Sequence, residues 1–124
     1  MLRTAAGRSF LAHCPAEVRE KILQDIRSSP PPEDVYFLGE ALLAKMLEQT
    51  AARGYATRYN EPYNPHTSSI AVPIYSGQTL LGSMAVIWIT KALTLAEGVD
   101  QFLGSMREAA QRISLNHERA HATA

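Results

Sequence analysis

Two adjacent serines precede the longest apolar stretch of the chain, and they are the first candidates for chemistry. His66, Ser68 and Ser69 lie close together, so a small hydrolase that uses Ser69 as its nucleophile is one interpretation. The nucleophile elbow of hydrolases places glycines around its serine in a strand-to-helix turn, whereas here a strand-like run follows the serines. We therefore expect the two hydroxyls to contact a bound ligand or to cap a strand edge.

The other reactive side chains are poorly placed for catalysis or metal binding. His13 and Cys14 are adjacent, and adjacent residues of a helix do not face each other. A thiol nucleophile at Cys14 is therefore a second, weaker enzyme alternative. His117 and His121 have an i, i+4 spacing, but they fall where we expect the last helix to fray. We predict a protein that is not an enzyme, without catalytic residues, metal or cofactor.

The serines belong to a predicted β-hairpin. Two apolar runs flank the short polar turn of residues 76–79, which contains Gly77, and this pattern is typical of two strands joined by a tight turn. The second run, residues 80–89, has only Ser83 as a polar residue, which predicts apolar contacts on both of its faces. Pro73 interrupts the first run, so that strand should lie at a sheet edge, or Pro73 at a bulge or non-bonded position.

Helical patterns surround the hairpin. We expect a first helix capped by Thr4, a second helix that starts at Pro15, and a third from about Glu33 to Ala52 that includes Leu38 and is closed by Gly54. A short strand (residues 55–59) and a loop (60–66) follow. Thr94 and Glu97 form a capping box for a last helix that should fray beyond about residue 117. The predicted order is helix, helix, helix, strand, hairpin, helix.

Composition limits the classes of function and the cellular setting that are expected. The 124 residues suffice for one domain, and 12 basic and 12 acidic side chains give a net charge of zero. A nucleic-acid-binding domain would show a basic excess, so direct DNA or RNA binding is not expected. One cysteine excludes an intrachain disulfide and fits a reducing, cytoplasmic setting. No apolar run reaches the length of a membrane span, so no membrane partner is expected.

Aromatic side chains gather around the strands, and one cation lies among them. The tyrosines could form core, or some could line a pocket for an aromatic ligand near Ser69. Arg58 could pair with a carboxylate of that ligand or could be solvated. The aromatic residues are Tyr55, Tyr59, Tyr63, Tyr75 and Trp88.

Several blocks resemble one protein family. Residues 4–12 (TAAGRSFLA) are similar to the start of the first long helix in the effector-binding domain of IclR-type transcriptional regulators. Residues 53–56 resemble the helix-to-strand junction of that domain, and residues 69–74 and 82–89 resemble its next two strands. The order and spacing of the blocks carry the resemblance, which covers nearly the whole chain.

The resemblance implies a GAF-like α/β (α+β) fold in which helices cover an antiparallel sheet. It also implies that residues 1–124 are a partial effector-binding domain whose N-terminal strands are missing, and that the domain forms a homodimer or homotetramer. DNA would be bound only through a winged helix-turn-helix that precedes the domain in the intact regulator and is absent from these residues. A ligand-free oligomerisation module is the alternative function.

The resemblance further implies a site for a small organic acid effector. By motif position, the effector-binding residues would be Ala5, Ala6, Gly7, Tyr59 or Asn60, Ser68, Ser69, Ala85 and Ile87. Ser69 replaces a cysteine, and Ala85 and Ile87 replace serines, of the glyoxylate- and pyruvate-responsive member. A hydroxyl opposite an apolar wall favours an aromatic acid, because ring burial is favourable by about 25 cal/mol per Å². The 13–15 segment (His-Cys-Pro) also resembles members that regulate phenylpropionate-type aromatic catabolism.

Overall fold

The computed structural model of the protein describes residues 1–31 and 39–122. The order of elements is the predicted one. The part of the third helix expected before Gly39, including Leu38, lies outside the described residues. The helices are α1 (Ala5–His13), α2 (Ala16–Ser28), α3 (Glu40–Arg53) and α4 (Leu95–Ala122), and the strands are β1 (Ala56–Arg58), β2 (Thr67–Ser76) and β3 (Thr79–Ile89).

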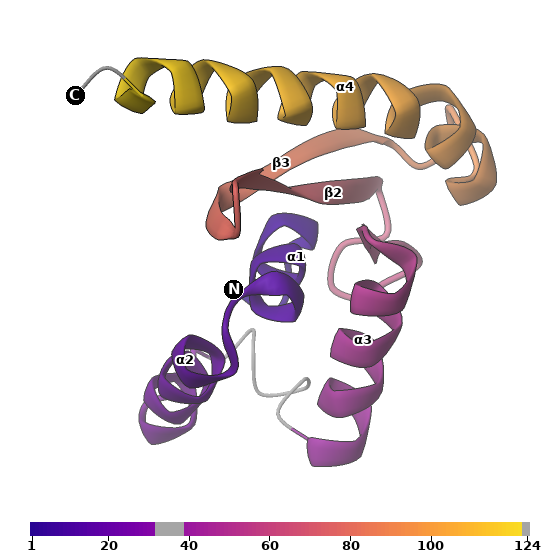
Figure 1. Ribbon diagram of the computed structural model, residues 1–124. Helices are drawn as coiled ribbons and strands as arrows, with labels where there is room; N and C mark the ends of the chain where they lie inside the picture. Colours follow the sequence, from indigo (N-terminus) through magenta and orange to yellow (C-terminus); the bar gives the residue numbers. More distant parts are fainter. Residues whose placement is uncertain (32–38, 123–124) are drawn as a thin grey trace.

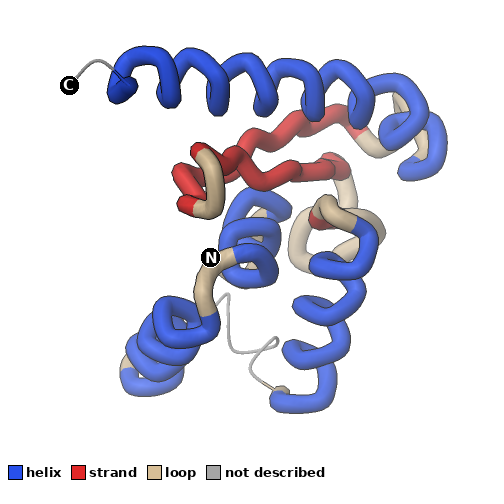
Figure 2. The backbone as a smooth tube through the Cα atoms, in the orientation of Figure 1, coloured by secondary structure: helices blue, strands red, loops and turns tan. Residues whose placement is uncertain are grey.

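The strands form one antiparallel sheet in the order β1-β2-β3. Figure 1 shows the layers: α4 runs along one face of the sheet, and α1 lies against the other face, with α3 beside it. The tube view shows the same stacking, with the strands between α4 and the remaining helices (Figure 2). A sheet with only three strands needs such helical cover to be stable.

The hairpin is present as predicted. Gly77 and Gln78 connect Ser76 of β2 to Thr79 of β3, which are paired. Gly77 has φ 60°, the left-handed backbone that a tight hairpin turn requires and that glycine adopts without strain. The turn is held from outside the hairpin, because the backbone N–H of Gly77 donates to Oε1 of Glu118 at 3.0 Å.

Pro73 lies in the central strand, but beyond the end of β1. The three residues of β1 pair with Ser69, Ile70 and Ala71, so β2 has only β3 as a neighbour at Pro73. The register also shifts between Ile74 and Tyr75. The proline is tolerated because this part of β2 is at an edge of the sheet, next to an irregularity, as proline in a strand requires.

The two faces of β3 differ in burial, so the prediction that both are covered is wrong for the described residues. Val86 and Trp88 face α4 and pack in the larger core. Ile87 and Ile89, which alternate with them, are 65% and 64% exposed. The reason is geometric: nine helical residues of α1 span about 14 Å, whereas the eleven residues of β3 span about 36 Å, so α1 covers only part of this face.

Two apolar cores lie on opposite sides of the sheet. The first joins the N-terminal segment to the helices α1, α2 and α3, and its buried members are Leu2, Leu11, Ala12, Leu23, Leu43 and Leu47. The second lies between the sheet and α4, and its buried members are Ile70, Val72, Trp88, Met106 and Ala110. The second core fixes which residues of β2 face away from α4, and these form the wall of the cavity described below.

The residues predicted to begin and end the helices do so in the structure. Thr4 accepts a hydrogen bond from the N–H of Gly7 at 3.0 Å, and Gly54 ends α3 with φ 85°. The N–H groups of Thr94 and Glu97 donate to each other's side-chain oxygens at 3.0 and 3.1 Å, a complete capping box.

Among the described residues α4 continues to Ala122, and the expected fraying beyond about residue 117 stays a prediction. The last turns of α4 contact the hairpin. Glu118 accepts from Gly77, and Nδ1 of His117 lies 2.9 Å from the hydroxyl of Ser76. A long-range anchor of this kind cannot be read from local sequence.

Candidate binding cavity

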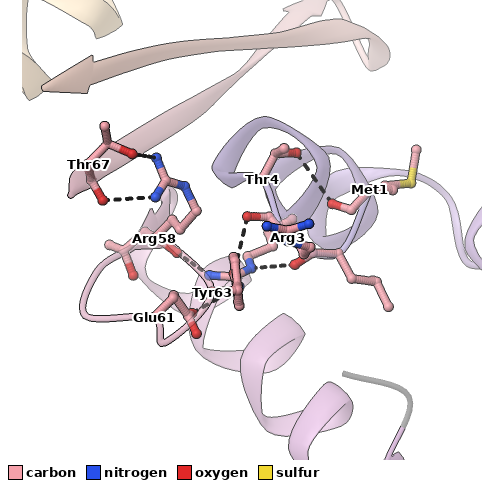
Figure 3. A network of polar contacts seen from close by, with 10 residues as sticks. Met1, Arg3, Thr4, Arg58, Glu61, Tyr63 and Thr67 are labelled. Carbon is pink, nitrogen blue, oxygen red and sulfur yellow. Dashed lines mark hydrogen bonds and ion pairs between the residues drawn. The ribbon is translucent and has the colours of Figure 1, made fainter. Parts of the chain in front are cut away.

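A cavity of about 620 Å³ lies between the N-terminal end of α1, the 60–66 loop and the face of β2 and β3 that α4 does not cover. This volume falls within the range of small-molecule sites in proteins. Figure 3 shows several of the lining side chains around the space beside α1. The lining residues are Met1, Arg3, Thr4, Ala5, Ala6, Arg58, Tyr63, Asn64, Thr67, Ser69, Ala85 and Ile87.

Strand alternation decides which serine reaches the cavity. Ser69 lies on the side of β2 that faces α1 and lines the cavity. Its hydroxyl donates to the carbonyl of Val86 at 2.9 Å, which leaves its lone pairs to accept a hydrogen bond from a ligand. Ser68 is also buried, but its Oγ lies 2.9 Å from Oγ1 of Thr90, and it does not line the cavity.

The structure brings together five of the residues proposed from sequence. Ala5 and Ala6 line the cavity at the first turn of α1, Ser69 lies on β2, and Ala85 and Ile87 lie on β3. Ala85 and Ile87 pair with Ala71 and Ser69 across the hairpin, which places the apolar residues beside the hydroxyl.

The other residues proposed from sequence lie outside the lining. Tyr59 is 45% exposed, and Asn60 has φ 56°, where the chain turns into the 60–66 loop. Gly7 has a structural role next to the cavity, because a Cβ atom there would collide with the carbonyl of Met1. This close approach lets the first residues of the chain fold back over α1.

A buried arginine holds the rim of the cavity together. Arg8 is 4% exposed. Its Nε donates to the carbonyl of Leu2 at 2.7 Å and its Nη1 to the carbonyl of Thr57 at 2.8 Å. Its Nη2 lies 3.0 Å from both Oε1 of Glu61 and the hydroxyl of Tyr63. One guanidinium therefore joins the N-terminal segment, β1 and the 60–66 loop.

Tyr63 forms a neutral aromatic wall. Its hydroxyl donates to the carbonyl of Arg3 at 3.3 Å. Burial raises the pKa of this phenol, an effect larger than the opposing influence of the nearby Arg8 charge. The guanidinium carbon of Arg3 lies 4.3 Å from the ring centroid, a cation–π distance.

Arg58 is the cation on the sheet side of the cavity. It is 6% exposed and donates to the carbonyl and the hydroxyl of Thr67 at 2.9 and 3.0 Å. Burial is the main cause that lowers the pKa of its guanidinium, and the charges of Arg8 and Arg3 add to the effect. The sequence left Arg58 as either a contact for a ligand carboxylate or a solvated side chain, and the structure places it in the lining.

Of the remaining polar lining residues, Tyr63 was one of several tyrosines that could line a pocket, whereas Arg3, Asn64 and Thr67 were not proposed for the site. Arg3, Tyr63, Asn64 and Thr67 enter it because the 60–66 loop folds back toward the N-terminal segment, with Glu61 bridged to Asn64. A loop with two prolines and two asparagines predicts turns but not their direction. The available signal was the concentration of cations and tyrosines near both segments.

The enzyme alternatives find no support in the geometry. The Sγ of Cys14 is buried and lies 3.5 Å from the carbonyl of Leu11, and Nδ1 of His13 lies 2.8 Å from the carbonyl of Ser9. Across residues 1–31 and 39–122, no three histidine, cysteine, aspartate or glutamate side chains are grouped to hold a metal ion. The cavity between the α1 N-terminus and the sheet, with cations and apolar groups in its lining, has the features of a small-molecule site on an α+β domain.

Comparison with known families agrees with this class. Residues 1–115 match the family described as bacterial transcriptional regulator IclR C-terminal. The chain therefore belongs to the IclR family and corresponds to its C-terminal, effector-binding domain, a regulatory and non-enzymatic domain with a GAF-like α+β fold.

Solved structures share the fold. A transcriptional regulator from Rhodococcus has a TM-score of 0.73 and 19% identity over 91% of this chain and 46% of its own. The inducer-binding domain of PobR from Acinetobacter, a double mutant with 3-hydroxybenzoic acid, has a TM-score of 0.70 and 18% identity over 90% and 65%. An IclR homologue from Microbacterium hydrocarbonoxydans, in complex with 4-hydroxybenzoate, has a TM-score of 0.66 and 26% identity over 91% and 44%.

The chain thus spans about half to two thirds of the length of these proteins. Within residues 1–31 and 39–122, no helix combines the length and the apolar character that a membrane crossing needs.

Proposed function

We propose that this domain senses a small organic acid, with an aromatic ring as the favoured scaffold, and passes the signal to the DNA-binding part of an IclR-type regulator in the cytoplasm. The observation that carries the proposal is the cavity, in which donors and apolar groups lie on different walls. Two relatives with the same fold hold hydroxybenzoates, which supports an aromatic acid here.

The carboxylate, the ring and a ring hydroxyl of such an acid each have a complementary group in the cavity lining. The first turn of α1 contains no acidic residue, and the backbone N–H groups of Ala5 and Ala6 begin the helix, where unpaired donors and the helix dipole favour an anion. Arg58 adds a full positive charge on the sheet side. Ala85 and Ile87 offer apolar contact to the ring, and Ser69 can accept a hydrogen bond from a ring hydroxyl.

Signal transfer would rest on a difference in affinity. An effector shifts an assembly only to the extent that it binds one arrangement better than another. We propose that the assembly is a homodimer or homotetramer, and that operator DNA is held by a winged helix-turn-helix outside these 124 residues. Family membership and the greater length of the relatives support this proposal.

A thermal-shift screen with hydroxylated aromatic acids tests the binding function. A ligand at one hundred times its Kd stabilises a protein by about 2.7 kcal/mol, so a true effector should raise Tm by several degrees. Ala85→Leu and Ser69→Leu should abolish the rise, because both fill the cavity. Ser105→Leu, an exposed change on α4, should retain it.

Two outcomes would contradict the proposal. One is that no acid stabilises the folded wild-type protein. The other is that Ala85→Leu responds like the wild type, since Ala85 is exposed and its change should leave the fold intact. The rival function, a ligand-free oligomerisation module, would then gain support if Ser69→Leu leaves assembly unchanged.

A further inference from the structure

Two guanidinium groups line the cavity without an acidic partner among the described residues. Arg58 is almost fully buried, and its hydrogen bonds go to Thr67, a neutral residue. Arg3 lies over the ring of Tyr63, and its Nε is buried without a hydrogen-bond partner. Figure 3 shows the two side chains on different sides of the same space.

Arg8 provides the contrast within the same cluster. Its charge is compensated by Glu61, which lies 3.0 Å away. The carboxylate of the 60–66 loop is therefore already paired with Arg8. No aspartate or glutamate is among the described residues that line the cavity. The phenol of Tyr63 stays neutral because burial raises its pKa. Among the described residues, Arg3 and Arg58 therefore have no carboxylate in direct ion-pair contact, and Glu61 acts on Arg58 only from beyond its pair with Arg8.

Buried charges without counter-charges are unfavourable, and a ligand of opposite charge removes the penalty. Burial is the main cause that lowers the pKa of Arg58; the charges of Arg8 and Arg3 lower it further, and Tyr63 and Glu61 oppose the change. The two cavity guanidiniums therefore act on each other. A monoanion would compensate one of them. Two acidic groups on one ligand would compensate both.

We infer that the effector is a diacid, with one carboxylate held by Arg58 and the first turn of α1, and with a second acidic group held by Arg3. The inference rests on the proposed function, which supplies the first carboxylate, and it makes Arg3 the residue that distinguishes diacids from monoacids. Arg3 is suited to this role because its guanidinium is oriented by stacking on Tyr63 and keeps an unused donor.

A pair of ligands that differ by one charge tests the inference. Benzene-1,3-dicarboxylate and 3-carbamoylbenzoate have the same ring and nearly the same shape, as do the 1,4 isomers. Calorimetric titration of the wild-type chain at low salt should show that at least one diacid binds about tenfold or more tightly than its amide partner, the scale of a charge-assisted contact. The preference should shrink as salt screens the charges.

Variants assign the preference to Arg3. Arg3→Gln should reduce the diacid-to-amide ratio to about one, chiefly by weakening the diacid, whereas Arg3→Lys should retain most of the preference. Arg58→Gln should weaken both ligands, since both carry the first carboxylate. Arg112→Gln, an exposed change on α4, should alter neither.

The outcomes separate the two proposals. If mono- and diacids bind but the wild-type ratio stays below about two, or if Arg3→Gln keeps the wild-type ratio, the diacid inference is wrong and the sensing function stands. If the protein is folded and neither ligand class binds, the sensing of aromatic acids fails and the diacid inference fails with it.

Discussion

Replacing Arg8 with methionine should lower the free energy of unfolding by about 3 kcal/mol. Removing one partner of a buried ion pair costs about 3–5 kcal/mol, because the other charge is left uncompensated. Glu61 keeps 18% of its side chain exposed, so water can partly solvate it, and this reduces the expected loss toward the lower limit. The carbonyls of Leu2 and Thr57 also lose their charged donor. Methionine retains the apolar part of the side chain, so the loss reports the network.

Urea denaturation at pH 7 measures this loss. Trp88, the single tryptophan, lies in the core between the sheet and α4, so its fluorescence reports unfolding from a site distant from the change. Circular dichroism should give a coincident transition if unfolding is two-state. Arg112→Met provides the matched control, since an exposed arginine on α4 should change stability by no more than about 0.5 kcal/mol.

A double-mutant cycle isolates the ion pair. Glu61→Gln keeps the shape of the side chain and removes its charge, and we expect a coupling energy of about 1 kcal/mol or more with Arg8→Met. A loss below about 1 kcal/mol for Arg8→Met, or a coupling energy near zero, would refute the assignment of Arg8 as the residue that joins the segments of the cavity rim.

Two further predictions concern α4. Gly98→Ala should lower stability by about 1–3 kcal/mol in urea denaturation, because the added Cβ would collide with the ring of Trp88. Gly104→Ala, where a Cβ meets nothing within 4 Å, should instead stabilise by up to about 1 kcal/mol, and equal effects would contradict the packing. Hydrogen bonds from Thr94 lower the pKa of Glu97. Its stabilisation is therefore present above its ordinary pKa of about 4.3 and lost as pH falls through the lower folded value. The Tm difference between wild type and Glu97→Ala should shrink from pH 5 to pH 3, and a constant difference would contradict the capping box.

Much of the fold could be predicted because its signals are local. Gly77 in a short polar turn, Gly54 after an amphipathic stretch, and Thr94 three residues before Glu97 each satisfy backbone geometry within a few residues. Pro73 also correctly limited the strand pairing at its position. It excluded a strand paired on both sides, and the short β1 leaves that position with one neighbour.

Two features of the structure depend on distant contacts. Ile87 looks like a core residue by composition, yet it is exposed because the nine-residue α1 covers only part of the eleven-residue β3. The last turns of α4 look polar and loose, yet Glu118 and His117 attach them to the hairpin turn. Neither result follows from hydrophobic periodicity, which reports the face of an element but not what covers it.

The residues of the cavity also fall into a group that the sequence predicted and a group that it did not. Ser69, Ala85 and Ile87 were placed by strand register and by the resemblance to IclR-type regulators, and the hairpin pairing brings them together. Arg3 was missed, and Tyr63 was only one of several tyrosines that could line a pocket, because the two residues meet only through the fold of the 60–66 loop and the network around Arg8.

The central claim is that the cavity beside α1 binds an organic acid, and amide chemical-shift mapping by NMR tests it most directly. On titration with an aromatic acid such as 4-hydroxybenzoate or benzene-1,3-dicarboxylate, we expect the largest shifts to cluster at Ala5, Ala6, Ser69 and Ala85. Shifts centred instead on the groove between α2 and α3, which contains Leu23 and Ala44, or no saturable shifts with either acid, would contradict it.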